Sequence, residues 1–513
     1  MSRLQHTVKN AKVTMFFYLV LLVLNFFSRR VFIDVLGVDI VGMTASMQSY
    51  IGMLNIAELG IGTAVAAVLY APIHRNDTGT ITEIVSILGY FGRVIAIVIA
   101  ASGVILSLFL PLLFAAEEVA VWVLYLTFYT FLVTTVLSYV VNYKQILLIA
   151  NQKNYIPVTI FNTTLIAKTI LQILLLRYFG FGLKMWLALE LVTAGAYAVW
   201  LEVRINREYP WLRSNVRQGR AYLKRYPDII RKIKQITSHR VSSFVLNQSD
   251  PIVIQLIMGV EMVTYYTNYT MIINRLLQFS TGALSSNTAG VGNLVAQGDK
   301  KKIELVFWQL NALYMWLGGV IGFCLYTFIT PLIRLWLPPT VEIFSDTVVL
   351  VFTLNMILTF AHQPLLQFTV GYGLFADWIA GWIFVGLNVV ISVVVGLLYG
   401  VVGIVLGTLV STFLVLILWR SHYLYTRGFG EKSAVRYYLA LAKYLLLLAV
   451  TWGAGTFVNS LLPPVVSWVQ LIINGAIILP AVALIYGGLL LFADGGMRTL
   501  VQVVLRGNFR SKH

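Results

Sequence analysis

Residues 13–36 read VTMFFYLVLLVLNFFSRRVFIDVL, a continuous apolar stretch that carries the consecutive cations Arg29 and Arg30. A helix of about 20 apolar residues crosses the hydrocarbon core of a bilayer, so this stretch predicts a membrane-spanning helix. A charged side chain near the middle of such a helix costs roughly 2.5 to 3.5 kcal/mol. Arg93, Lys168 and Arg275 lie inside later apolar stretches in the same way. We therefore expect a hydrated, protein-lined interior that binds an anionic ligand.

The rest of the chain has the composition of a polytopic membrane protein. Its 513 residues are 59% hydrophobic and 11% charged, with a mean hydropathy of +0.84. These values exclude an ordinary soluble domain and predict an all-α fold with about 14 transmembrane helices. The approximate spans are 13–36, 43–70, 81–110, 120–142, 156–179, 184–203, 235–258, 262–292, 303–330, 346–370, 375–398, 401–419, 438–459 and 465–491.

Cysteine and histidine are sparse and scattered in this sequence. The single cysteine, Cys324, excludes an intrachain disulfide framework, and the six histidines do not have the spacing of a metal site. We therefore expect no metal and no redox cofactor.

The distribution of Lys and Arg predicts the orientation of the chain. If both termini are cytoplasmic, the inner segments contain 27 of the 37 Lys and Arg residues, the spans contain eight, and the outer loops contain only Lys184 and Arg334. This asymmetry accounts for the net charge of +17 without a nucleic-acid partner. The basic loop 204–234 is then placed to contact anionic lipid headgroups. The first span has no small-residue cleavage site, so we expect a retained helix rather than a signal peptide.

The two halves of the chain resemble each other at an offset of 222 residues: VLGVDIV at 35–41 matches IMGVEMV at 257–263. Six spans separate the copies, which predicts two six-helix bundles of the same orientation related by a pseudo-twofold axis along the membrane normal. The predicted divisions are a first bundle (1–203), a basic cytoplasmic loop (204–234), a second bundle (235–420), a loop (421–437), two further helices (438–491) and a cytoplasmic tail (492–513).

Polar side chains recur at helical spacing within several spans, which indicates helix faces that meet water or other helices. Our candidates for contact with an anionic substrate are Arg29, Arg30, Arg93, Lys168, Arg275, Asn25, Asn247, Asn274 and Gln278. Two structural alternatives remain open for them. The amides could bond between helices, and the cations could form internal ion pairs, such as Arg30 with Asp34 or Arg93 with Glu190.

Several sequence blocks resemble the polysaccharide (Wzx-type) flippases of the multidrug/oligosaccharidyl-lipid/polysaccharide exporter superfamily. They are FFSRRVFIDVLGVDIVG from Phe26, AELGIG and LYAPI before residue 74, NQSDPIVIQLIMG from Asn247, YYTNYTMIINRL from Tyr265, GVGNLVAQGD from Gly290, LIRLWL at 332–337, HQPLLQFTVGYGLFADW at 362–378 and GVVGIVLGTLVST at 400–412. Individually these blocks are loose, but their order and spacing cover most of residues 10–420. The last two spans are similar to the family only in number and place.

The resemblance implies a non-enzymatic flippase in a bacterial cytoplasmic (inner) membrane. Such a protein moves an undecaprenyl-pyrophosphate-linked oligosaccharide to the outer leaflet by alternating access, for O-antigen and lipopolysaccharide, capsule or exopolysaccharide biosynthesis. The implied partners are this anionic lipid-linked oligosaccharide, membrane lipids, and the polysaccharide polymerase and chain-length machinery. Exporters of this superfamily use a proton or sodium gradient, and our candidate coupling carboxylates are Asp34, Glu58 and Asp250.

Three other functions remain as alternatives. A lipid II flippase for peptidoglycan would share the helix plan and the basic interior. A multidrug exporter would carry cationic drugs and favour an acidic interior, whereas the spans here hold more cations than acids. A membrane glycosyltransferase or polymerase would need catalytic residues in large outer loops, and the predicted outer loops are short and nearly uncharged, which gives no catalytic candidate.

Overall fold

The computed structural model describes residues 3–58, 60–115, 117, 119–284, 287–374 and 378–505, and in these residues it contains helices and no strand. Among these described residues, ten helices are long and apolar enough to cross a membrane by length and composition. Each of the predicted spans coincides with helix in the described part of the chain. The prediction of an all-α polytopic membrane protein is therefore confirmed.

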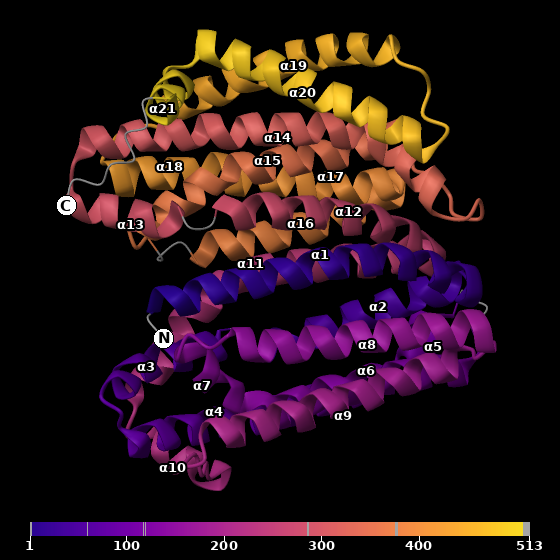
Figure 1. The fold of residues 1–513 in the computed structure, drawn as a ribbon, viewed down its shortest axis with the longest axis vertical. Helices are drawn as coiled ribbons and strands as arrows, with labels where there is room; N and C mark the ends of the chain where they lie inside the picture. The colour runs from indigo at the N-terminus through magenta and orange to yellow at the C-terminus, as the bar shows by residue number, and fades with distance from the viewer. Residues whose placement is uncertain are drawn as a thin grey trace. The chain divides into compact units, whose positions relative to one another are not determined.

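The chain folds into two compact units, residues 1–264 and 265–513 (Figure 1). The helices that begin in the first unit are α1 (Arg3–Leu36), α2 (Val38–Leu54), α3 (Ile61–His74), α4 (Thr78–Ser107), α5 (Leu110–Leu113), α6 (Val121–Val141), α7 (Gln145–Ala150), α8 (Tyr155–Phe179), α9 (Leu183–Glu208), α10 (Gly219–Leu223), α11 (Pro227–Met258) and α12 (Val260–Leu284). Within this unit α8 packs along α1, and α6 lies between α4 and α9.

The second unit contains most of α12 and the remaining helices. These are α13 (Asn287–Gln297), α14 (Lys300–Trp336), α15 (Asp346–Gly371), α16 (Trp378–Tyr399), α17 (Val401–Ser411), α18 (Arg420–Leu424), α19 (Val435–Ser460), α20 (Trp468–Ala493) and α21 (Gly495–Leu505). Figure 1 shows α19 and α20 side by side against α14. The most apolar part of α15 is 72% buried, so α15 forms the core of this unit, whereas α20 is only 28% buried and exposes apolar side chains as a lipid-facing helix does.

The sequence repeat is reproduced in the backbone. Gly37 and Gly259, 222 residues apart, both have positive φ, at +86° and +89°, and each precedes a helix. Asp77 and Asp299 stand in the same relation, and each caps the next helix by accepting a hydrogen bond from the amide three residues later. Because glycine alone adopts positive φ without strain, and Asp is a preferred N-cap, both halves use the same local signals.

In two predicted spans the structure has a feature that the prediction lacks, a break in one and a long extension in the other. The second span, 43–70, is broken by a 3₁₀ turn, Asn55–Glu58, and by Gly60 at φ +86°. The span predicted to end at residue 419 instead continues as helix to Phe429, through the π-helical segments Thr412–Trp419 and Tyr425–Phe429. The break is marked in the sequence by Asn55, Glu58 and Gly60, whereas the extension to Phe429 is not marked, because the apolar run ends at Trp419.

Candidate functional site

The first unit contains two adjoining polar cavities. The smaller, of about 290 Å³, lies between α6, α8 and α9, and the larger, of about 590 Å³, lies between α3, α4, α6 and α7. Ser138 and Asn142, at the end of α6, line both. Together the two cavities form a hollow with polar groups in its wall inside a mostly apolar bundle. Such a hollow can hold a hydrated group at membrane depth.

An ion pair defines the smaller cavity. Lys168 Nζ on α8 lies 2.8 Å from both carboxylate oxygens of Glu190 on α9. Gln172, one turn further along α8, donates to Glu190 at 3.1 Å and to the carbonyl of Trp186 at 3.2 Å. Both charged side chains are only 16% exposed, so the pair and its amide partner fix α8 against α9.

Asn142 forms the wall between the two cavities. The α-helix α6 ends at Val141, and a 3₁₀ turn, Asn142–Lys144, leads into α7. Asn142 is 7% exposed, and its Oδ1 has no hydrogen-bond partner among the described residues. A buried acceptor of this kind costs about 1–3 kcal/mol unless a ligand or water satisfies it, so Asn142 is a candidate ligand-binding residue.

Glu58 lines the larger cavity from the 3₁₀ turn that breaks the second span. Gly62 lies beside it, and a Cβ there would be 3.5 Å from Glu58 Oε1. Tyr139 and Gln145 face the same cavity, and Gln145 accepts a hydrogen bond from Tyr197 at 3.1 Å. The described lining of the two cavities therefore combines amide and hydroxyl groups with one carboxylate and one ion pair.

A second set of contacts within the first unit connects the turns at Gly37 and Gly259, which the repeat relates, and the loop before α6. We call this set of residues the turn seam; its members are Arg29, Val38, Gly42, Glu117, Val260 and Thr264. Thr264 Oγ1 donates to the carbonyl of Val38 at 2.6 Å. Arg29 Nη2 donates to the carbonyl of Thr264 at 3.2 Å, and Glu117 accepts from the amide of Val260 at 2.9 Å. These bonds hold the start of α12 against α1, α2 and the loop before α6.

Close approach of the backbones makes the turn seam possible. A Cβ on Gly42 would lie 1.8 Å from the carbonyl oxygen of Val260, so only glycine allows α2 and α12 to cross there. Glu117 is surrounded by the repeated acids Asp39 and Glu261. Burial raises the pKa of the Glu117 carboxyl, the hydrogen bond from Val260 opposes that rise, and the two neighbouring negative charges add to it.

The other predicted cations differ in their surroundings. Arg30 pairs with Asp34 across one helical turn at 3.8 Å, as its spacing suggests. Glu190 pairs with Lys168, so the suggested Arg93–Glu190 pair is wrong, because α9 packs against α8 at that position. Arg93 is exposed on α4, next to the exposed apolar Val94.

The remaining predicted residues lie on α1, α11 and α12. Arg275 Nη1 donates to Gln278 at 3.3 Å, and Asn274 and Gln278 are exposed. Asn25 is half-buried on α1, and Asp250 is 5% exposed on α11. The side chain of Asn247 falls outside the described residues.

The cavities also contain residues that the sequence did not single out, chiefly Ser138, Asn142 and Gln145. Ser138 and Asn142 continue an i, i+4 series from Thr134 within the predicted span 120–142, so helical spacing could have selected them, whereas Gln145 lies beyond the end of that span. The signal that the sequence did contain is the cluster of polar residues in SYVVNYKQ at 138–145.

Comparisons with known proteins show the fold. No family model and no curated protein matches the chain. Among solved structures it is similar to "Lipid II flippase MurJ, inward closed conformation", with a TM-score of 0.64 and 14% identity over 95% of this chain and 99% of that one. It is also similar to an inward-facing multidrug resistance MATE family transporter of the MOP superfamily, with a TM-score of 0.57 and 13% identity over 78% and 94% of the two chains.

A third similar structure is a mutant of the Vibrio cholerae MATE transporter VcmN, with a TM-score of 0.51 and 15% identity over 83% of this chain and 99% of that one. The chain therefore has the fold that these solved structures share.

Proposed function

We propose that this protein is a flippase that moves an undecaprenyl-pyrophosphate-linked oligosaccharide from the inner to the outer leaflet of a bacterial cytoplasmic membrane. The observation that carries the proposal is the fold, which matches a lipid II flippase over 95% of this chain. The sequence blocks that resemble polysaccharide flippases favour a surface-polysaccharide unit as the cargo, for O-antigen, capsule or exopolysaccharide.

The chemistry of the cargo agrees with the residues available. A pyrophosphate carries about two negative charges that cannot enter hydrocarbon, and arginine is the side chain best suited to bind it with paired hydrogen bonds. We assign this role to Arg29 and Arg275. Arg30, Arg93 and Lys168 also remain candidates, although Lys168 is held by its buried ion pair with Glu190, whereas Arg30 forms only a long, partly exposed pair with Asp34.

The sugar part of the cargo needs neutral donors and acceptors. The polar cavities of the first unit offer them through Asn142, Ser138, Gln145 and the nearby hydroxyls of Thr134 and Thr164. We also keep Asn25, Asn247, Asn274 and Gln278 as sugar ligands. Weak, numerous contacts of this kind suit a carrier, because binding too tightly in one state would prevent release in the other.

A second candidate function is lipid II flipping in peptidoglycan synthesis, because the similar solved structure with a TM-score of 0.64 is named for that activity. Both cargoes share the polyprenyl pyrophosphate and differ in the sugar and peptide. Multidrug export is a weaker candidate, supported by the MATE neighbours.

Depletion of the protein separates these functions. Cells that lose a polysaccharide flippase accumulate the lipid-linked repeat unit on the inner leaflet and lose the surface glycan, without lysis. Accumulation of lipid II followed by lysis would instead favour the second candidate. Unchanged lipid-linked sugars with increased drug sensitivity would contradict both flippase proposals.

Energy coupling by a proton or sodium gradient is part of the proposal, with Glu58 and Asp250 as the first candidates. Glu58 lines the larger cavity, and Asp250 is a buried carboxylate on α11. Asp34 is a weaker candidate, because it pairs with Arg30. The expected partners are the polysaccharide polymerase, the chain-length machinery and the surrounding membrane lipids.

A further inference from the structure

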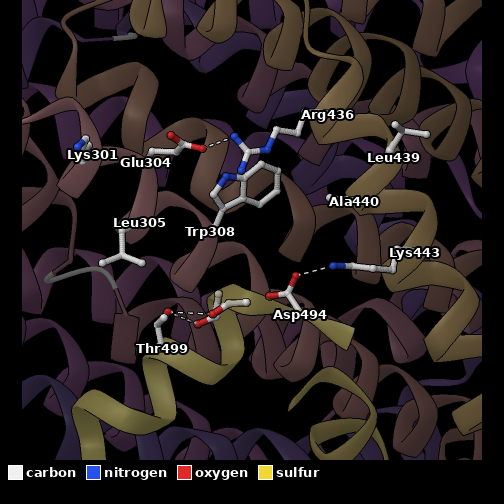
Figure 2. A pocket seen from close by; sticks show the side chains of 12 residues that line it. Lys301, Glu304, Leu305, Trp308, Arg436, Leu439, Ala440, Lys443, Asp494 and Thr499 are labelled. Carbon is white, nitrogen blue, oxygen red and sulfur yellow. Dashed lines mark hydrogen bonds and ion pairs between the residues drawn. The ribbon is translucent and has the colours of Figure 1, made fainter. Parts of the chain in front are cut away.

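A third cavity, of about 660 Å³, lies within the second unit where α14, α19, α20 and α21 meet (Figure 2). Lys301 and Trp308 on α14, Arg436 and Lys443 on α19, and Asp494 at the end of α20 line it. We call it the terminal pocket. It lies at the beginnings of α14 and α19, which the distribution of Lys and Arg places at the cytoplasmic membrane surface.

Both carboxylates of the terminal pocket form ion pairs, Asp494 in a buried position and Glu304 in one that is 45% exposed. Asp494 is 5% exposed and accepts from Lys443 at 2.6 Å, from the Tyr444 hydroxyl at 3.1 Å and from the Met497 amide at 3.1 Å. Glu304 forms an ion pair with Arg436. Figure 2 shows these two pairs on either side of Trp308.

The cations of the pocket outnumber its carboxylates, although Lys443 also donates to the carbonyl of Ala493 at 3.2 Å. The side chains of Arg436 and Lys443 are 63% and 36% exposed despite their ion pairs, so part of each cation still faces open space. Trp308 Nε1 is buried and has no hydrogen-bond acceptor among the described residues. Lys301 adds a third cation, so the two carboxylates leave a net positive charge. An acceptor-rich anion would balance this set.

The dipoles of α14 and α19 also favour the binding of an anion in the terminal pocket. Lys301 is in the first turn of α14, and Arg436 is in the first turn of α19. The amino-terminal end of a helix carries a partial positive charge, which disfavours cations and favours anions. Two cations at such ends therefore add to the field of the helices instead of cancelling it, and a phosphate group would relieve the repulsion.

The apolar border of the pocket suggests where the anion comes from. Leu305 and Leu439 line the pocket and are 43% and 68% exposed. The next helix, α21, exposes Val504 and Leu505, which would lie among lipid tails if α21 lies in the plane of the membrane surface. A soluble anion would gain nothing from this border, whereas a lipid would place its acyl chains along it.

We propose that the terminal pocket binds the phosphate group of an anionic phospholipid of the inner leaflet. Lys301, Lys443 and Arg436 contact the phosphate oxygens, and the acyl chains lie against Leu305 and Leu439. This site is separate from the cargo residues proposed above, and the proposal does not depend on the identity of the cargo.

Native mass spectrometry of the purified full-length protein tests this proposal. The protein is mixed with phosphatidylglycerol, with zwitterionic phosphatidylcholine, or with inorganic phosphate, and the retained adducts are counted. Ala440→Glu places a negative charge in the pocket wall, and Lys301→Gln removes a cation that forms no ion pair among the described residues. Ser433→Glu and Lys432→Gln make the same charge changes on the exposed loop before α19, outside the pocket.

We expect wild type to retain phosphatidylglycerol in preference to phosphatidylcholine. Ala440→Glu should lower that retention roughly fivefold or more, Lys301→Gln should lower it less, and both loop variants should match wild type. Equal retention of the two lipids, equal losses in pocket and loop variants, or binding of inorganic phosphate without phosphatidylglycerol would each overturn the proposal. A thermal melt of every variant without added lipid checks that the fold is intact.

Discussion

Lys168 and Glu190 form a two-oxygen ion pair, with the lysine nitrogen 2.8 Å from each carboxylate oxygen and both side chains largely buried. The pair lies inside the first unit, at the wall of a polar cavity. Lys168 is therefore held by a neighbouring helix, and its contribution to stability can be separated from any contact with cargo.

Lys168→Met should destabilise the purified protein by about 3–5 kcal/mol, because it leaves the Glu190 carboxylate buried without its partner. Lys168→Met/Glu190→Leu should recover most of that loss, since it removes both charges. Thermal unfolding in detergent measures the difference, with Lys184→Met outside the cavity as the control. If single and double variants keep wild-type stability but lose transport, Lys168 acts on cargo instead.

Arg29→Ala and Arg275→Ala should abolish transport of the lipid-linked oligosaccharide while membrane expression stays normal, because each removes a bidentate donor for pyrophosphate. Arg29→Lys and Arg275→Lys should restore it only in part, since lysine keeps the charge without the planar donor pair. Surface glycan measured in complemented cells gives the readout. Arg177→Ala, near the end of α8, is the matched control. Normal surface glycan in both alanine variants would contradict the assigned roles.

Glu117 should make the protein less stable as pH rises above the ordinary glutamate pKa of 4.5. Its pKa is raised in the folded state by burial, so the folded protein binds this proton more tightly than the unfolded chain, and stability falls as the pH rises towards the raised pKa. Glu117→Gln keeps an oxygen for the Val260 amide without the charge. This variant should be more stable than wild type at pH 7, with a flatter profile in melting curves between about pH 4 and 8.

Asp39 and Glu261 face Glu117, so their variants provide the control for this profile. Asp39→Asn and Glu261→Gln should each shift the pH dependence to lower pH, because they remove a neighbouring negative charge. A profile that Glu117→Gln leaves unchanged would show that another group is responsible.

Gly42→Ala should open the turn seam, because its new methyl group would meet the carbonyl oxygen of Val260. Overpacking of this kind costs about 1–3 kcal/mol. Gly195→Ala is the matched control, since it lies within α9 with nothing in contact distance and should be neutral or slightly stabilising. Thermal melts compare the two, and equal melting temperatures for Gly42→Ala and wild type would mean that the helices can separate freely.

Asp250→Asn and Glu58→Gln should each uncouple transport from the ion gradient, because neither amide can exchange a proton or bind a cation as a carboxylate does. Transport in proteoliposomes, with and without an imposed proton or sodium gradient, measures the effect. Asp228→Asn, on the exposed start of α11, is the control. Gradient-driven transport at the wild-type rate in both variants would exclude these carboxylates.

Apolar length and the repeat predicted the fold from the sequence. Runs of about 20 apolar residues located the helices, since backbone groups in lipid must bond within their own segment. The matched turns at Gly37 and Gly259 followed from the repeat, because both combine a positive φ with an extended ψ, a conformation that is essentially restricted to glycine. The extension of helix to Phe429 was not predicted, because polar residues after Trp419 hide it.

The candidate site was harder to predict, because the charge of a residue does not indicate whether its side chain faces the cavity, the lipid or another helix. Arg93 and Lys168 look alike in the sequence, yet one is exposed on α4 and the other is paired with Glu190. Which helices pack together decides such a pairing, and apolar spacing does not encode it. The role of Asn142 was not predicted for a related reason. Its side-chain oxygen is buried because α6 ends at Val141 and the chain turns there, and only the structure shows this burial.

The matched caps at Asp77 and Asp299 have a consequence for biogenesis. Each half of the chain carries its own signals for where a helix begins, so the first half can complete these turns while the ribosome is still translating the second. The same local folding steps therefore occur twice while one chain is synthesised. A substitution at one cap would delay formation of the helix start in its own half only. Pulse-labelled nascent chains would show this delay at a defined chain length.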